Sequence, residues 1–218
     1  SSDAGRTFAP NRKVADYSCE CCRIAMAETP ERDVAVFWRH IFGENLHIRD
    51  HGFAVIGKDR VITPLQWATR DNWELEGCPH HGPSMVSAGD GSYHISWFTL
   101  GDERKGIFYG RYHPGTGQLD NLSTMATVGA SHPYIARIGS NLMLVWKQFD
   151  GDKTNIRLAV SRDDGNTWQP ETTVISTSGA SDHPLLITHS GAGWLSWHTS
   201  DEGLRIIPLN HKQQVSGR

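Results

Sequence analysis

The sequence predicts an all-β fold, on three observations: short alternating segments, turn-forming clusters between them, and an internal repeat of about fifty residues. Apolar and polar residues alternate in 33–40 (DVAVFWRH), 92–98 (SYHISWF), 141–149 (NLMLVWKQF) and 193–200 (GWLSWHTS). Alternation over such lengths is typical of half-buried strands. Clusters such as HPGTG and SRDDGNT separate the segments and favour turns. Long helical periods are missing, so we expect strands throughout.

The repeat is marked by a proline and a tryptophan in each copy: Pro83 with Trp97, Pro133 with Trp146, and Pro184 with Trp197. The prolines recur after 50 and 51 residues and the tryptophans after 49 and 51. A looser first copy has Arg23 and Trp38 at these places. A further strand-like segment follows each tryptophan: 48–56, 106–112, 155–161 and 204–210.

Antiparallel strands in units of this length predict a β-propeller of four-stranded blades. We expect one domain over 1–218, made of a blade end (1–17) and blades at 18–77, 78–128, 129–178 and 179–218. The last blade shows no clear fourth strand. Either 11–17 (NRKVADY) closes it, giving a four-bladed ring, or N-terminal blades are missing from an incomplete ring. The second is favoured, because the chain opens inside a hairpin motif.

Two octets, SSDAGRTF at 1–8 and SRDDGNTW at 161–168, share the pattern S-x-D-x-G-x-T-aromatic. They resemble the Asp box of the sialidase (BNR-repeat) superfamily, which implies a hairpin staple away from any active face. An Asp in such a turn accepts backbone N–H groups, and a Gly permits a positive φ. The expected staple residues are Ser1, Asp3, Gly5, Thr7 and Phe8, and Ser161, Asp163, Gly165, Thr167 and Trp168.

The sialidase resemblance implies an arginine cluster for a substrate carboxylate, a Tyr nucleophile with a Glu partner, and an acid/base carboxyl group. Arg23, Tyr134 and Arg137 match weakly, and Tyr134 has no glutamate in its own blade. We therefore assign no catalytic residue and expect a non-hydrolytic protein. One alternative is an exo-sialidase-type glycoside hydrolase with catalytic residues partly in missing blades. A second is a protein-interaction scaffold.

All four cysteines lie in YSCECCR (17–23) and GCPHHGP (77–83). In the repeat alignment Cys22, His132 and His183 each come one place before the proline position. Propeller chains arrive there near the central axis, so these side chains should converge on an axial funnel. The candidate metal ligands are Cys19, Cys21, Cys22, Cys78, His80, His81, His132 and His183.

The cysteines allow two interpretations. They form disulfides, with Cys19–Cys78 suited to a bridge between blades, or they form a metal site. Thiolate with imidazole suits copper or zinc, although C-x-C-C does not match the C-x₂-C spacing of zinc fingers. Haem is not expected, because CxxCH is missing, and neither is a nucleotide. His47 and His51 are expected at the surface or in a hairpin.

A net charge of −3 does not suggest nucleic-acid binding, and no apolar run is long enough for a membrane span. The combination of octets, CECC and CPHH resembles exported bacterial sialidase-like proteins. It implies a periplasmic or secreted protein, with no signal peptide in this chain. The expected partners are a small ligand, a glycan or a metal at the funnel, and other exported proteins.

Overall fold

The computed structural model describes residues 1, 3–44 and 47–209, and its regular elements are all strands. The strands are, in chain order, β1 (Ala25–Glu28), β2 (Val34–Arg39), β3 (His51–Ile56), β4 (Gln66–Trp67), β5 (Ser84–Ser87), β6 (Tyr93–Leu100), β7 (Lys105–His113), β8 (Gln118–Ala126), β9 (Ala130–Ile138), β10 (Asn141–Phe149), β11 (Thr154–Ser161), β12 (Thr172–Thr177), β13 (Leu185–His189), β14 (Ala192–Thr199) and β15 (Gly203–Pro208).

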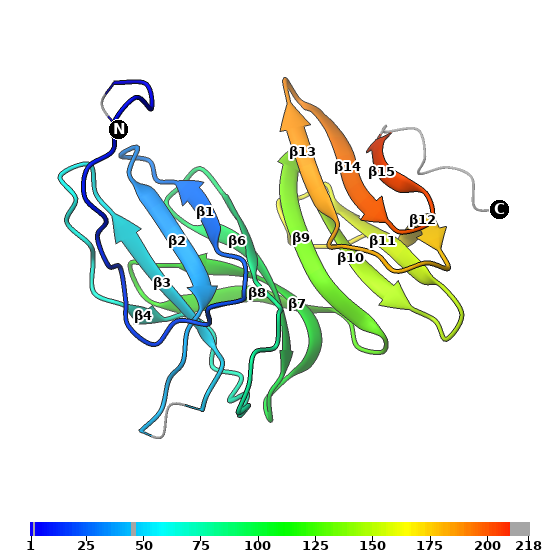
Figure 1. Cartoon of the computed structure of the whole chain (residues 1–218), viewed down its shortest axis with the longest axis horizontal. Helices are drawn as coiled ribbons and strands as arrows, with labels where there is room; N and C mark the ends of the chain where they lie inside the picture. Colours follow the sequence, from blue (N-terminus) through cyan, green and yellow to red (C-terminus); the bar gives the residue numbers. More distant parts are fainter. Residues whose placement is uncertain (2, 45–46, 210–218) are drawn as a thin grey trace.

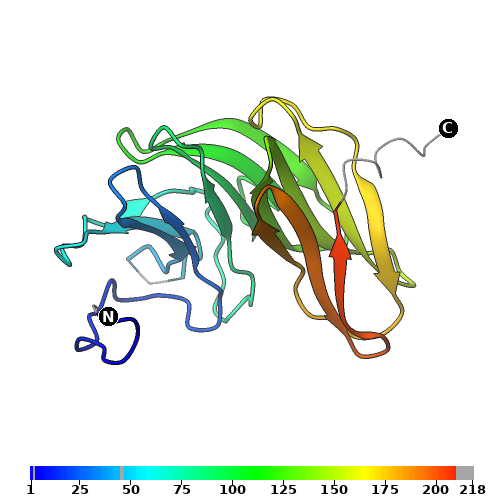
Figure 2. The same ribbon diagram turned by 90° about the horizontal axis from the view of Figure 1, so that it is seen from above.

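The strands form four antiparallel sheets in chain order: β1–β4, β5–β8, β9–β12 and β13–β15. Each sheet is one blade of a β-propeller, as predicted (Figure 1). The innermost strands are neighbours in series, with β1 beside β5, β5 beside β9 and β9 beside β13. The first and fourth blades lie on opposite sides in both views (Figures 1 and 2).

The fourth blade has three strands among the residues that the structure describes, and Asn210, the end of its predicted last segment, lies outside them. Residues 11–17 do not pair with β15. They form an irregular segment whose Ala15 packs on Val36 and Trp38 of the first blade. The interpretation in which this segment closes the last blade is therefore wrong for this structure, because its apolar contact is with the first blade.

Most of the core lies between blades, and a smaller cluster around Trp38 lies in the first blade. Trp97 belongs to the cluster between blades one and two, Trp146 to the one between two and three, and Trp197 to the one between three and four. All three side chains are at most 1% exposed. Full burial of a tryptophan stabilises a fold by roughly 3 kcal/mol or more. The repeat therefore marks the surfaces on which successive blades meet.

In blades one, two and four the tryptophan of the second strand also holds the chain that leads into the blade. The indole N–H of Trp97 donates to Asp71, 2.8 Å away, and that of Trp197 to the Asp182 carbonyl at 3.0 Å. Trp38 donates to Ser18 at 3.1 Å. Each of these acceptors precedes an innermost strand. Ser18 and Asp182 lie shortly before β1 and β13, whereas Asp71 lies further upstream of β5, so these hydrogen bonds fix the path of the chain into three of the blades.

The two octets form the same turn. Asp3 Oδ1 and Asp163 Oδ1 each accept a backbone N–H from the threonine four residues later, in both cases at 2.9 Å. The first serine of each octet accepts the glycine N–H, again in both cases at 2.8 Å. Trp168 is partly buried against Tyr109, whereas Phe8 is 78% exposed. The second octet therefore also serves as a packing element, which the first does not.

Asp164, inside the second octet, joins blades two and three. Its carboxylate accepts hydrogen bonds from Arg137 of β9 and, at 3.2 Å, from Arg111 of β7. Arg137 also contacts the buried His94 ring. Arg137, a weak catalytic candidate from the sequence, is placed here in an inter-blade ion-pair network.

One histidine prediction is wrong: His51 is fully buried and not a surface residue. Its Nδ1 lies 3.0 Å from the Thr69 hydroxyl, and its ring packs against Phe37. Burial lowers its pKa well below the ordinary value, so His51 belongs to the core as a neutral imidazole. His47 lies at an exposed position, as expected.

The octets offer a matched test of packing against backbone strain. Gly165 and Gly5 have φ values of +86° and +85°, but an added Cβ at Gly165 would overlap the Tyr109 hydroxyl, whereas at Gly5 it would meet open space. We expect Gly165→Ala to lower the free energy of unfolding by about 3 kcal/mol and Gly5→Ala by at most about 1 kcal/mol. Chemical denaturation measures both, and equal losses would contradict the packing role.

Candidate functional site

The candidate site is built from the residues with which the chain arrives at each innermost strand. We call 18–24, 78–83, 130–133 and 181–184 the leading segments. Three of them immediately precede β1, β5 and β13, and 130–133 forms the first four residues of β9. These innermost strands lie side by side around the axis. Chain positions about fifty residues apart are thereby brought to one end of the propeller.

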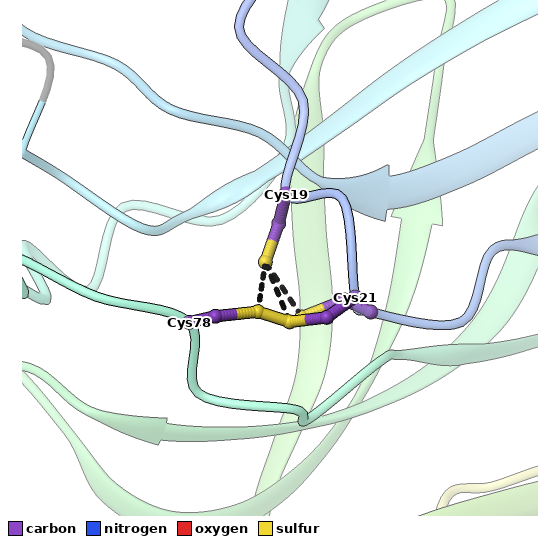
Figure 3. A group of neighbouring side chains, drawn as sticks. Cys19, Cys21 and Cys78 are labelled. Atoms are coloured by element: carbon purple, nitrogen blue, oxygen red, sulfur yellow. Dashed lines mark hydrogen bonds between the residues drawn. A yellow bond between two sulfur atoms is a disulfide. The ribbon is translucent and has the colours of Figure 1, made fainter.

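Four cysteine sulfurs gather where the first two leading segments meet (Figure 3). All four lie within 4.8 Å of one another. Cys21 and Cys78 form a disulfide that joins the first two blades, with Cα atoms 6.5 Å apart and a separation of 57 positions in the sequence. The predicted disulfide between the blades is thus present, but Cys78 bonds to Cys21 and not, as expected, to Cys19.

Cys19 and Cys22 are free thiols, and both are buried. Cys19 Sγ lies 2.9 Å from Cys22 Sγ, 3.6 Å from Cys78 Sγ and 3.8 Å from Cys21 Sγ. Cys19 and Cys22 are themselves separated by two residues. The prediction that the segment lacks a C-x₂-C spacing is therefore wrong, because that spacing spans the outer pair of the C-x-C-C motif.

A buried guanidinium adjoins the thiols. Arg39 of β2 is 1% exposed, and its hydrogen bonds go to backbone carbonyls: His81 at 3.0 Å, Phe98 at 2.6 Å, and Arg49. Burial lowers its pKa to about 10, although the charge interactions with Cys22 and Cys19 act to raise it. Arg39 therefore remains a cation at neutral pH beside the thiols. Sequence analysis missed it, since a strand arginine gives no sign of its burial.

Burial also governs the thiol chemistry. The pKa of Cys22 is raised to about 12, first by removal from water and then by its contact with Cys19. Arg39 and the backbone N–H of His81 act in the opposite direction, because both favour a thiolate. The His81 backbone thus links the cysteine cluster to the second leading segment.

Gly82 permits this close approach. A Cβ there would lie 2.6 Å from the Arg23 backbone nitrogen, too close for any side chain. Gly82 stands where the other copies carry Cys22, His132 and His183. The second blade therefore has no side chain at this repeat position, and His81 next to it takes the place facing the neighbouring histidines.

Three imidazoles form a row across blades two, three and four. The His81 and His132 ring centroids are 4.4 Å apart, and those of His132 and His183 are 3.8 Å apart. Phe98 continues the row beyond His81 at 4.1 Å. The predicted convergence of these histidines on one end of the propeller thus has a definite geometry, which is a stack of rings.

A β-bulge places the middle ring. Val145 pairs with Tyr134 and Lys147 with Ser131, so His132 and its neighbour Pro133 both face one residue of β10. His132 has a φ of +54°. Bulges redirect side chains and are frequent beside functional sites. The backbone irregularity turns His132 toward the row, and nothing in the sequence pattern predicted it.

The imidazoles are neutral bases at physiological pH. Burial is the main cause that lowers the pKa of His132 to about 2, and the neighbouring rings lower it further. The pKa of His81 is lowered to about 4 by burial and then by Arg39, and that of His183 to about 4 by burial and then by Arg23. Buried Nδ1 atoms of His81 and His132 have no hydrogen-bond partner among the described residues.

The eight candidate ligands therefore fall into two adjacent groups. The four cysteines form one group, and His81, His132 and His183 form the row. His80 is exposed beside the row, with a φ of +57°, and its proximity is a minor cause of the lowered pKa of His81 and of His183. The sequence alignment pointed to one mixed cluster, but the described ligand atoms that gather most closely are all sulfur.

An axial cavity of about 390 Å³ opens beside the leading segments, and all four innermost strands line it. Arg23 and Tyr134 lie at its wall, with the guanidinium carbon 6.0 Å from the Tyr134 ring centroid. Met26 and Leu185 expose apolar surface there. No Asp or Glu side chain is among the described lining residues. Sequence analysis missed the apolar members, which look like ordinary strand residues.

The histidine row makes a pH prediction. The folded-state pKa of His132 lies below its ordinary value, so the unfolded chain takes up the proton first as pH falls below 6.5. The contribution of the neutral His132 imidazole to the free energy of unfolding is fully present above pH 6.5 and is lost progressively as the pH falls below that value. We expect wild-type protein to lose up to about 3 kcal/mol more stability between pH 7 and pH 4 than His132→Phe. Chemical denaturation at both pH values measures this, and parallel losses would contradict it.

No family model and no curated protein matches the sequence. Among solved structures, an exo-β-1,3-galactanase from Phanerochaete chrysosporium with galactose superposes with a TM-score of 0.56 at 9% identity, over 86% of this chain and 50% of that one. An Aleuria aurantia lectin in complex with α-methyl-L-fucoside gives 0.55 at 11% identity, over 87% and 61%. An exo-1,5-α-L-arabinanase from a bovine ruminal metagenomic library gives 0.54 at 13%, over 96% and 84%.

The chain thus spans half of the galactanase and about three fifths of the lectin. At these identities the likeness concerns the fold, and it agrees with four radially arranged antiparallel sheets. No helix in the described part of the chain is long and apolar enough to cross a membrane. By its architecture, this protein is a β-propeller.

Proposed function

We propose that this protein is an exported, sialidase-like β-propeller that does not hydrolyse glycosides and that holds a copper or zinc ion at its cysteine cluster. The observation that carries the proposal is the gathering of four sulfur atoms within 4.8 Å at the junction of two blades. Four-cysteine sites are a common way for proteins to bind zinc, and soft thiolates also select Cu(I).

The spacing of the sulfurs supports a tetrahedral site. Four thiolates about 2.3 Å from a zinc ion lie about 3.8 Å from one another. Cys19 Sγ already stands 3.8 Å from Cys21 Sγ and 3.6 Å from Cys78 Sγ. Reduction of the Cys21–Cys78 disulfide and a widening between Cys19 and Cys22 would complete the set. The proposal therefore requires the reduced protein.

The charges around the cluster also support it. Four thiolates around a divalent ion carry two net negative charges, which are costly to bury without a counter-charge. Arg39 supplies a buried cation next to Cys19 and Cys22, and among the described residues its guanidinium donates to backbone carbonyls and not to a carboxylate. The His81 N–H adds a hydrogen bond to Cys22. In this proposal the imidazoles border the site, while sulfur provides the ligands.

Two further observations support the proposed export and the proposed lack of glycoside hydrolysis. A disulfide between blades is typical of proteins in oxidising compartments, which favours export. Glycoside hydrolysis ordinarily needs two carboxyl groups around the scissile bond, and the described lining of the axial cavity contains none.

We expect fully reduced protein to bind one zinc ion per chain, and protein with the Cys21–Cys78 disulfide to bind none, because two ligands are then lost. Cys22→Ser should weaken binding at least tenfold, since sulfur is replaced by a poorer ligand. His132→Phe should stay within twofold of wild type. Competition with a chromophoric chelator measures these affinities, and with a Cu(I)-specific chelator the copper alternative. Equal affinity of wild type and Cys22→Ser would contradict the site.

The axial cavity favours a second candidate function, the binding of a carboxylate-bearing sugar. Arg23 is partly buried, and its guanidinium makes no hydrogen bond or ion pair with a described residue. A cation beside an aromatic ring and apolar side chains suits a small anionic glycan. This is the binding half of the sialidase resemblance, without its hydrolytic carboxylates.

Calorimetric titration with the methyl glycoside of N-acetylneuraminic acid tests this candidate. We expect binding by wild type, and at least a tenfold loss in Arg23→Met, because the charge that pairs with the carboxylate is removed. Arg6→Met, at an exposed octet position, is the matched control and should bind as wild type does. Methyl galactoside, which lacks the carboxylate, should not bind. In a separate assay with a fluorogenic sialoside, release of the aglycone would instead support the hydrolase alternative.

A further inference from the structure

The four cysteines consist of an exposed disulfide and, behind it, a buried pair of thiols. Cys21 and Cys78 are solvent-exposed, while Cys19 and Cys22 are 9% and 8% exposed. Cys19 lies in the middle of the group, since it is the residue whose sulfur is within 4 Å of each of the others. Figure 3 shows its side chain pointing at the Cys21–Cys78 bond.

From this arrangement we propose an activity that does not depend on any metal: the protein exchanges its disulfide internally, moving it from the exposed pair Cys21–Cys78 to the buried pair Cys19–Cys22. The chain would thus hold one disulfide, which accepts two electrons, in either of two places. The exposed form accepts electrons from a dithiol reductant in solution. The buried form protects the disulfide and frees Cys21 and Cys78.

The exchange takes place in two balanced steps. The Cys19 thiolate attacks Cys78 Sγ, a Cys19–Cys78 bond forms, and the Cys21–Cys78 bond breaks with Cys21 leaving as thiolate. The Cys22 thiolate then attacks Cys19 Sγ, forming Cys19–Cys22 and releasing Cys78 as thiolate. The two protons lost by Cys19 and Cys22 end on Cys21 and Cys78. One disulfide is present throughout, so no external oxidant or reductant is needed.

The distances favour each step. Cys19 Sγ lies 3.6 Å from Cys78 Sγ and 2.9 Å from Cys22 Sγ, so both sulfur pairs that must bond are already in contact. Cys19 is nearly equidistant from the two bonded sulfurs. Attack along the S–S axis therefore requires a rotation of the Cys19 side chain. Cys19 and Cys22 also have the C-x₂-C spacing of reversible dithiols.

Exchange has a consequence for the fold. The Cys21–Cys78 bond joins blades one and two, whereas Cys19–Cys22 lies within one leading segment. Moving the disulfide removes the covalent tie between the blades beside the axial cavity. Because Cys22 and Arg23 are neighbours in the chain, the same movement reaches the cavity wall.

Tryptic mapping distinguishes the two forms without ambiguity. Cys19, Cys21 and Cys22 fall in one tryptic peptide, 14–23, and Cys78 falls in another, 71–104. The exposed disulfide cross-links the two peptides. The buried disulfide releases 71–104 with Cys78 alkylated and leaves 14–23 with an internal bond and one alkylated thiol.

The experiment starts from protein with one disulfide per chain, kept at pH 8 with EDTA and without oxygen, and quenched at intervals with acid and N-ethylmaleimide. We expect peptide 71–104 to be released over time at a rate independent of protein concentration. In Cys22→Ser, release of peptide 71–104 should be blocked and the intermediate with a Cys19–Cys78 bond should accumulate. Cys19→Ser should release 71–104 at least tenfold more slowly. Near-UV circular dichroism checks that both variants are folded.

Wild-type protein that keeps 71–104 cross-linked as long as Cys19→Ser does would overturn the proposal. So would a release rate proportional to protein concentration, since that indicates exchange between chains. EDTA separates this result from the metal proposal, which is tested on fully reduced protein. Either proposal can therefore fail while the other stands.

Discussion

Face-to-face packing of neighbouring blades is the constraint on which the structure depends. Blades two, three and four each bury a tryptophan of the second strand against the preceding sheet: Trp97, Trp146 and Trp197. The indole N–H groups of Trp97 and Trp197 then hold the chain that leads into the same blade. One residue type thus supplies the apolar area between blades and fixes the path of the incoming backbone. The geometry of the axial end follows from this double role.

Because the leading segments meet at one end of neighbouring innermost strands, residues fifty to sixty positions apart become neighbours. This explains a row of imidazoles from three blades, a cysteine cluster from two, and a cavity lined by four innermost strands. Removal from water keeps the histidines of the row neutral, and the buried Arg39 lies close to the two buried thiols. Metal binding and disulfide exchange would use the same sulfurs in different oxidation states, so the reducing conditions around the protein select between them.

The strands could be predicted closely because apolar alternation and turn residues are local signals. The convergence of Cys and His residues was also predictable, since the repeat fixes which positions face the axis. The pairing within that group was not. Cys19 and Cys21 are two residues apart, and which of them reaches Cys78 depends on the path of one irregular loop. The separation into sulfur cluster and ring row likewise depends on a bulge at His132 and on a glycine at 82.

The sequence by itself determined the blade rhythm, the octet turns and the positions that approach the axis, because each is set by residues near one another in the chain. Only the tertiary structure decided that Arg39 and His51 are buried, that Arg137 serves an inter-blade ion-pair network, and that Cys21 bonds to Cys78. Burial and partner choice depend on sheets that meet across long stretches of chain. No local pattern carries that information.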